Sequence, residues 1–186
     1  MTLSPLSDAG RILRWVNAQR MELILVALTL LATVTMSFLT LRQTTSHFRI
    51  ERTTSFVARF NSQEMVSLRE DVDRWLETKE TAKSLYERST SQPVEAGAEL
   101  RSAADAARGM VAKLRTMANF FQEFGSAIKA GSLDEDYAQE LLGAVCVRYA
   151  VALEPFILET RVQRKRVSAY QEVFWLKDRM AALDAK

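Results

Sequence analysis

Residues 119–136 read NFFQEFGSAIKAGSLDED, and this stretch decides the fold because it contains the end of one helix and the start of the next. Lys129 and Gly131 match a helix end, with a cation in the last turn and a glycine that can take the left-handed conformation. Ser132 and Glu135 then match the S-x-x-E capping box that begins a helix. We therefore expect two helices to meet at a corner at Gly131.

Apolar residues on both sides of this corner have helical spacing. From about Ala98 to Ile128 they recur every three or four positions, which predicts a helix of about thirty residues with a continuous apolar face. Beyond the corner the pattern continues to Leu153 and should be interrupted at Pro155, because proline lacks a backbone N–H. The acidic residues 134–136 suit the first turn of this second helix, where the macrodipole favours negative charge.

Two more helices are predicted from capping boxes. Asn61 and Glu64 precede one apolar stripe, and Ser168 and Gln171 precede another. Residues 89–99, STSQPVEAGAE, are predicted to be a connection because they contain proline and glycine and almost no large apolar residue. There is no strand pattern and no internal repeat, so the predicted fold class is all-α, with a small antiparallel helical bundle.

The apolar stretch ahead of the bundle predicts a transmembrane helix. From Leu23 to Leu41 the sequence reads LILVALTLLATVTMSFLTL, nineteen residues without a charge, glycine or proline. At about 1.5 Å per residue this run spans about 28 Å, close to the thickness of the bilayer core. A cleaved signal peptide is the alternative, but the run exceeds the usual apolar region of about 7 to 15 residues and no A-x-A-like cleavage site follows.

Four segments follow from this pattern. They are an amphipathic interfacial N-terminal segment at 1–20, the transmembrane helix at 21–41, a helical stalk at 42–60 and a helical soluble domain at 61–186. In the first segment, Trp15 and several arginines suit the level of the lipid headgroups.

A ridge of small polar residues runs along the predicted span. Thr29, Thr33 and Ser37 recur every four residues, which would let a second helix approach closely. Alternatively, each hydroxyl bonds a carbonyl of its own helix. We expect the chain to contact the lipid bilayer and to associate through span and stalk with a second copy, or with a protein partner.

Composition argues against several classes of function. A net charge of +2 gives no field that would attract nucleic acid. The six glycines are never closer than six residues apart, so the sequence contains neither G-x-G-x-x-G nor a P-loop. His47 and Cys146 are the only residues of their types and cannot assemble a zinc site rich in histidine or cysteine. The sequence therefore nominates no catalytic, cofactor-binding or metal-ligating residue, and Cys146 is expected in the core.

Two charged groups remain as alternatives. Asp136 and Glu140, one helical turn apart, could act as paired carboxylates, although an acidic first turn is also common without a ligand. Four cations close the second helix; they are Arg161, Arg164, Lys165 and Arg166. These cations could contact anionic lipid or an acidic partner, or simply suit the helix dipole.

Five short motifs occur in order in the C-terminal part of the chain. They are NFFQ at 119–122, GSLDE at 131–135, RY at 148–149, EPFI at 154–157 and YQEVFWL at 170–176. Together they resemble a bacterial family of short, single-span, membrane-anchored helical proteins that is classed as a domain of unknown function. The resemblance implies one span and a helical cytosolic domain, and it implies no activity.

These observations favour a non-enzymatic, membrane-anchored interaction or scaffold module, including an accessory subunit of a membrane complex. The alternative is a membrane-bound effector that forms a pore, or an enzyme whose carboxylates act with a metal. We expect a single-pass protein of the bacterial inner membrane with its soluble domain in the cytoplasm. The positive-inside rule favours this orientation by four arginines to three; they are Arg42, Arg49, Arg52 and Arg59 after the span, and Arg11, Arg14 and Arg20 before it.

Overall fold

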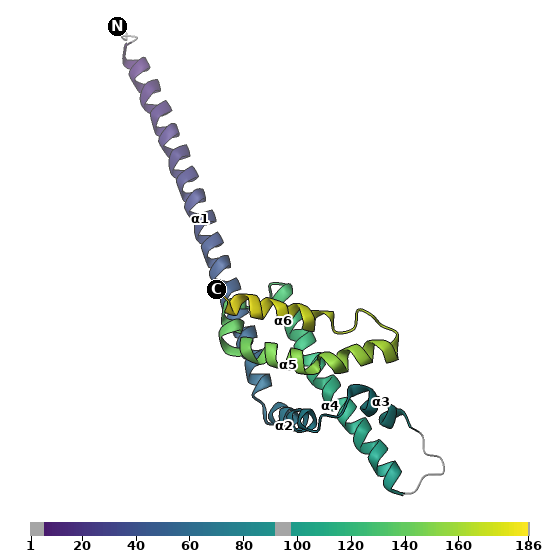
Figure 1. Cartoon of the computed structure of the whole chain (residues 1–186). Helices are drawn as coiled ribbons and strands as arrows, with labels where there is room; N and C mark the ends of the chain where they lie inside the picture. Colours follow the sequence, from purple (N-terminus) through teal and green to yellow (C-terminus); the bar gives the residue numbers. More distant parts are fainter. Residues whose placement is uncertain (1–5, 92–97, 186) are drawn as a thin grey trace. The chain divides into compact units, whose positions relative to one another are not determined.

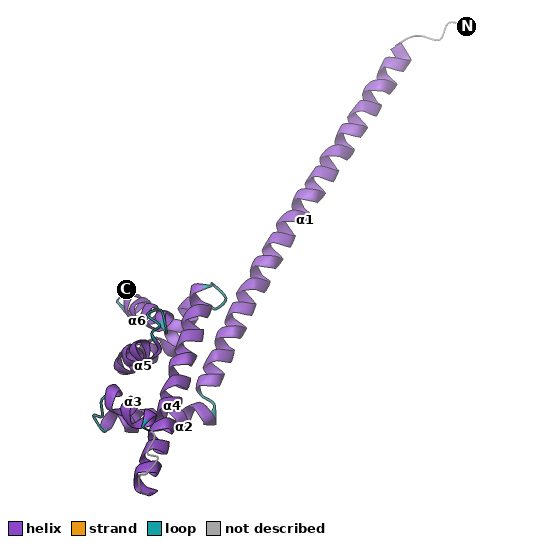
Figure 2. Ribbon diagram, turned by 90° about the vertical axis from the view of Figure 1, so that its right-hand side faces the viewer, coloured by secondary structure: helices purple, strands orange, loops and turns teal. Residues whose placement is uncertain are grey.

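The computed structural model describes residues 6–91 and 98–185, with side chains from Arg20 onward. These residues form helices and no strand, which confirms the all-α prediction (Figure 1, Figure 2). The helices of the described part are α1 (Leu6–Phe60), α2 (Gln63–Glu77), α3 (Ala82–Thr90), α4 (Ala98–Lys129), α5 (Glu135–Arg164) and α6 (Gln171–Asp184).

The chain divides into two compact units, Met1–His47 and Phe48–Lys186. The predicted stalk at 42–60 therefore falls partly in each unit. In the predicted interfacial segment at 1–20, residues 1–5 and the side chains of residues 6–19 lie outside the described part of the chain. Most of the predicted connection at 89–99 also lies outside the described residues.

The core of the second unit is built around the NFFQEF segment of α4, residues 119–124. Its three phenylalanines are fully buried, and their rings pack against aromatic residues in the last turns of α1 and in the middle of α5. Their ring pairs with other helices include Phe56–Phe124 at 5.3 Å, Phe60–Phe120 at 5.5 Å and Phe121–Tyr149 at 5.8 Å between centroids. Because each buried phenylalanine contributes about 1.5–3 kcal/mol, this cluster fixes α1 and α5 on α4.

Two polar contacts add to the attachment of the end of α1. The Arg59 guanidinium lies 2.7 Å from the Glu123 carboxylate of α4. The backbone N–H of Asp134 donates to the Thr53 hydroxyl over 3.0 Å, and Thr53 is fully buried. Residues of α1 from Phe48 onward therefore belong to the bundle.

Helices α5 and α6 form an antiparallel hairpin, and they lie side by side in Figure 1. The direction follows from their ion pairs, because Arg179 near the end of α6 contacts Glu135 at the start of α5 over 2.8 Å. Lys177 contacts Glu154, further along α5, over 3.2 Å. α6 also packs on α4, where the N–H of Glu172 donates to Gln122 Oε1 over 3.0 Å.

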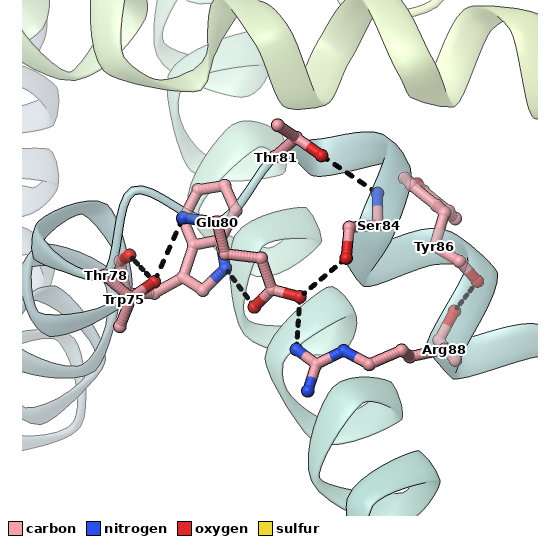
Figure 3. A network of polar contacts seen from close by, with 8 residues as sticks. Trp75, Thr78, Glu80, Thr81, Ser84, Tyr86 and Arg88 are labelled. Carbon is pink, nitrogen blue, oxygen red and sulfur yellow. Dashed lines mark hydrogen bonds and ion pairs between the residues drawn. The ribbon is translucent and has the colours of Figure 1, made fainter.

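The break between α2 and α3 was not predicted, because no glycine or proline marks it. Lys79 takes a left-handed φ of 55° there. Figure 3 shows how polar groups hold the break: Glu80 accepts hydrogen bonds from the Trp75 indole, the Ser84 hydroxyl and the Arg88 guanidinium. Thr81 then caps α3 by accepting from the N–H of Ser84. Side-chain hydrogen bonds thus replace the usual turn residues.

The predicted helix end at Gly131 is confirmed. Gly131 has φ +65°, and its N–H donates to Ile128 O over 2.8 Å. The N–H of Ser132 donates to Ala127 O over 3.0 Å. These two bonds form a Schellman motif, which satisfies the last carbonyls of α4.

The three predicted capping boxes are wrong in detail. Ser132 belongs to the Schellman turn, so Asp134 caps α5 by accepting from the N–H of Tyr137. Ser62 rather than Asn61 caps α2, because the N–H of Asn61 still bonds Val57 O at the end of α1. α6 begins after Tyr170, at φ 58°, without a side-chain cap.

The predicted interruption at Pro155 is also wrong. α5 continues through it from Glu135 to Arg164, and Pro155 lies on the exposed side of the helix. Proline removes one backbone hydrogen bond, to the carbonyl of Val151. Packing of the opposite, buried face against the core holds the helix together across that loss.

We expect Gly125→Ala to destabilise the bundle. A Cβ at this position would lie 2.7 Å from the backbone oxygen of Glu172, so α6 would have to move away from α4. The expected loss is about 1–3 kcal/mol, as for other overpacked sites. Gly109→Ala is the matched control, because no atom lies within 4 Å of its added Cβ. It should stabilise α4 by up to about 1 kcal/mol. Thermal melting in mild detergent measures both, and an equal change in the two variants would contradict the packing described.

Gly131→Val should cost on the order of 1 kcal/mol or more, because a β-branched residue is strained at φ +65°. Gly131→Asn should be milder, since asparagine tolerates the left-handed region. Equal melting temperatures for the two variants would rule out backbone strain as the reason for glycine here.

Candidate functional site

The first unit exposes an unusually apolar surface. Every residue from Arg20 to Arg52 is exposed, including Leu23 at 69% and Phe38 at 64%. By length and composition this part of α1 could cross a membrane, and none of its most apolar window is buried. α5 passes the same length and composition test, but 44% of its window is buried in the bundle.

Two hydroxyls of the small-residue ridge donate hydrogen bonds to carbonyls of α1 itself. Thr29 Oγ1 donates to Leu25 O, and Thr33 Oγ1 donates to Thr29 O, both over 2.8 Å. This matches the alternative in which each hydroxyl bonds its own helix. Association through the ridge stays a prediction, and it would have to rest on close packing rather than on these two hydroxyls.

α5 carries an exposed row of residues along its whole length. Their positions alternate by three and four, the spacing of a helix that packs on another helix. The row consists of Leu141, Ala144, Arg148, Val151, Pro155, Leu158 and Val162. Val151 is 54% exposed and Val162 70% exposed, although both belong to a helix whose other face forms the core. We call this set the α5 row.

Opposite charges lie at the two ends of the α5 row. Asp136 and Glu140 are exposed near the start of α5, whereas Arg164, Lys165 and Arg166 are exposed at its end. None of these five side chains forms an ion pair with another residue in the described part of the chain. The Asp136 carboxylate attracts Arg179 of α6, and Arg164 lies two residues beyond Val162, on the opposite side of the helix. The charges available to a partner beside the row are therefore those of Glu140, Lys165 and Arg166.

The basic end of α5 borders a shallow depression of about 720 Å³. Arg161, Lys165 and Arg166 line it, together with Phe174 of α6. Arg161 is held in place, because its Nε donates to Ala169 O over 2.8 Å and its guanidinium lies 4.7 Å from the centre of the Phe174 ring. The predicted group of four cations is thus one structural arginine and three exposed cations.

The one charged residue of the α5 row, Arg148, forms an ion pair within its own chain. Arg148 contacts Asp73 of α2 over 3.1 Å, and the Tyr149 hydroxyl donates to the same carboxylate over 3.1 Å. Burial raises the pKa of Tyr149, and the nearby Asp73 carboxylate raises it further. The hydroxyl is therefore a fixed donor that ties α5 to α2.

The residues considered for catalysis do not come together. His47 is exposed in the first unit, and Asp136 and Glu140 lie on the exposed surface of α5. Cys146 is fully buried, which confirms its predicted place in the core. Among the described residues, no three histidine, cysteine or carboxylate groups are placed to share a metal ion.

A protein-family model described as Domain of unknown function (DUF4760) matches residues 27–180. The chain belongs to this family. The match confirms the prediction that the chain belongs to a family of unknown function. The DUF4760 region also takes in much of the apolar part of α1 and all of the bundle helices up to residue 180 in α6. No curated protein and no solved structure matches the chain significantly.

Sequence reasoning missed the α5 row of this DUF4760 protein. The apolar pattern up to Leu153 predicts a single apolar face, and Pro155 predicts an interruption. The alternating three and four spacing was readable from the sequence, but two apolar faces on one helix cannot be assigned to core or surface without the fold.

The thiol of Cys146 should be inert in the folded protein. Burial raises its pKa to about 12, so almost no thiolate forms near pH 8. We expect no reaction with a thiol reagent at pH 8 in mild detergent and complete reaction of one thiol in urea. Rapid reaction of the folded protein would contradict the burial described.

Proposed function

We propose that this protein is a non-enzymatic, membrane-anchored interaction or scaffold module that serves as an accessory subunit of a membrane complex. The apolar part of α1 anchors it, and the helical bundle presents a surface to other proteins. The anchoring sequence is the uncharged run from Leu23 to Leu41.

The exposure of that run is the observation that carries the proposal. Its large apolar side chains are 48–69% exposed, and none of its most apolar window is buried. Leaving so many apolar side chains in water is costly, at about 25 cal/mol for each Å². A lipid bilayer would cover them, and an uncharged helix of about 28 Å has the length to span its core.

The character of the bundle supports interaction rather than catalysis. The best acid–base candidates, Asp136 and Glu140, lie on an exposed surface, and the single thiol is buried. General acid–base catalysis usually depends on groups whose pKa is shifted in a cleft. The surface of α5 instead combines exposed apolar residues with unpaired charges, which is the composition of a protein contact.

We further propose the bacterial inner membrane as the location, with a single span and with the bundle in the cytoplasm. The support is the excess of one arginine on the bundle side of the apolar run. The lone Cys146, which cannot form an internal disulfide, suits a reducing compartment.

Membrane anchoring is tested by washing membranes in alkaline carbonate. The wild-type chain should stay in the membrane pellet at its full length. Leu31→Arg with Val34→Arg should release it, because each arginine near the centre of a span costs about 2.5–3.5 kcal/mol on insertion. Ala112→Arg, on the exposed side of α4, is the control and should remain in the pellet. A wild-type chain that is soluble and shortened would mean that the run is a signal peptide.

Orientation and partners need separate measurements. Alkaline phosphatase fused after Lys186 should be inactive, and an active fusion would place the bundle outside the cytoplasm.

Affinity purification in mild detergent should recover a stoichiometric protein partner or a second copy. Vesicles that contain the purified protein should retain a trapped dye, and the protein should hold no metal after dialysis. Leakage or tightly bound metal would favour the effector alternative.

A further inference from the structure

We propose that α5 is a self-association surface, and that it pairs antiparallel with α5 of a second copy through the α5 row. This inference rests on the proposed function, because it names the partner of the interaction module. The partner is another copy of the same chain, related by a two-fold axis that runs between the two α5 helices near Val151.

The spacing of the α5 row is the first argument. Alternation by three and four residues keeps the row on one side of the helix from Leu141 to Val162, a length of about 30 Å. A second exposed row on α4 has the same spacing but a different composition. It consists of Asp105, Gly109, Ala112, Thr116, Asn119, Glu123, Ser126 and Ala130. Helical periodicity alone therefore does not place large apolar residues at exposed positions, because the α5 row contains them and the α4 row does not.

The charges at the ends of the row are the second argument. In an antiparallel pair, the start of one α5 lies beside the end of the other. Glu140 of one copy then lies near Lys165 and Arg166 of its partner, and the same contacts repeat on the other side of the axis. Glu140, Lys165 and Arg166 are exposed and form no ion pair with other described residues, so the arrangement adds attraction without breaking a contact.

The pair of opposite charges also decides between possible partners. An anionic lipid surface would attract the basic end of α5 and repel its acidic end. A parallel pair of copies would place like charges side by side at both ends. Only the antiparallel pair brings each end next to the opposite charge.

The middle of the row fits this symmetry. Val151 lies midway between Leu141 and Val162, so it would face its own counterpart across the axis. The only charged residue of the row, Arg148, is already paired with Asp73 of its own chain. A second copy would thus cover apolar groups without leaving a buried charge alone.

Membrane anchoring makes such a contact effective. One helix face buries less than the about 800 Å² per partner that is usual for a stable interface. Two copies held in the same membrane meet at a raised effective concentration, which compensates for a small contact. The contact should therefore be measured on the full-length chain in its membrane.

Disulfide cross-linking of single-cysteine variants tests the position of the two-fold axis. We expect Val151→Cys to form a disulfide-linked dimer under mild oxidation in isolated membranes. Thr116→Cys, at an exposed position of α4, is the control for random collision and should give at least tenfold less dimer. The native Cys146 is buried and should not contribute. Equal yields from Val151→Cys and Thr116→Cys would overturn the proposal.

A pair of cysteines gives the direction. Leu141→Cys and Val162→Cys should each give little dimer alone, whereas the double variant should cross-link efficiently. The two positions lie about 30 Å apart along one helix, so they cannot form a disulfide within a chain. Efficient dimers from each single variant would mean a parallel pair and would contradict the proposal.

Charge reversal tests the ends. In the Val151→Cys background, Glu140→Arg should lower the dimer yield at least fivefold, because a cation then faces the cations of the partner. Adding Lys165→Glu with Arg166→Glu should restore it, since the opposite charges then return in reverse order. Failure of the triple charge variant to recover, with an unchanged circular dichroism spectrum, would show that the charges do not pair between copies.

Failure of this inference can be told apart from failure of the proposed function. A chain that resists carbonate extraction but gives no specific dimer through Val151 overturns the α5 pair and leaves the anchored module in place. Protection of Val151→Cys from a water-soluble thiol reagent without cross-linking would indicate lipid or another protein on the row, and would also overturn it. Release of the wild-type chain by carbonate would overturn the anchored module whatever the cross-linking shows.

Discussion

Burial of the NFFQEF phenylalanines is the constraint on which the rest of the bundle depends. These three rings can be shielded only by helices on more than one side of α4, and the chain supplies the last turns of α1 and the middle of α5. The end of α1 is therefore not a free stalk, because Phe56 and Phe60 are part of the same aromatic cluster. The glycine at 125 is a consequence of that arrangement, since α6 covers α4 at that point with its backbone against the helix.

α5 has two apolar faces, one packed in the core and one exposed. One side supplies Cys146, Tyr149 and Phe156 to the core, and the other carries the α5 row. This explains why α5 is apolar enough to pass a test for membrane spans although it belongs to the bundle. It also explains how the helix continues past Pro155, because the buried side holds it while the proline ring lies on the exposed side.

The sequence predicted those features that depend on residues close together in the chain. The length of α4, its stop at Gly131 and the burial of Cys146 follow from periodicity and from local conformation. The capping residues were missed by one or two positions, because Ser132 and Asn61 are used by the preceding turn, and a capping motif does not reveal that competition. The break at Lys79 depends on Glu80 meeting Trp75 and Arg88, and no local signal marks it. The candidate surface was partly readable: its charges and its spacing are in the sequence, but only the fold shows which apolar face of α5 is left uncovered.

The hydrogen bond from the N–H of Asp134 to the Thr53 hydroxyl joins residues that are synthesised at different times. Its partners are 81 residues apart, so the end of α1 leaves the ribosome long before the residues that cover it. At about 5–20 residues per second, roughly 4 to 16 seconds pass between the synthesis of Phe56 and Phe60 and the synthesis of α4 and the start of α5. During that interval an aromatic helix end lies next to the apolar run and has no native neighbour. A chaperone or the membrane surface would have to shield it, so a pause in translation between α3 and α4 should lower the yield of folded protein more than the same pause after α6.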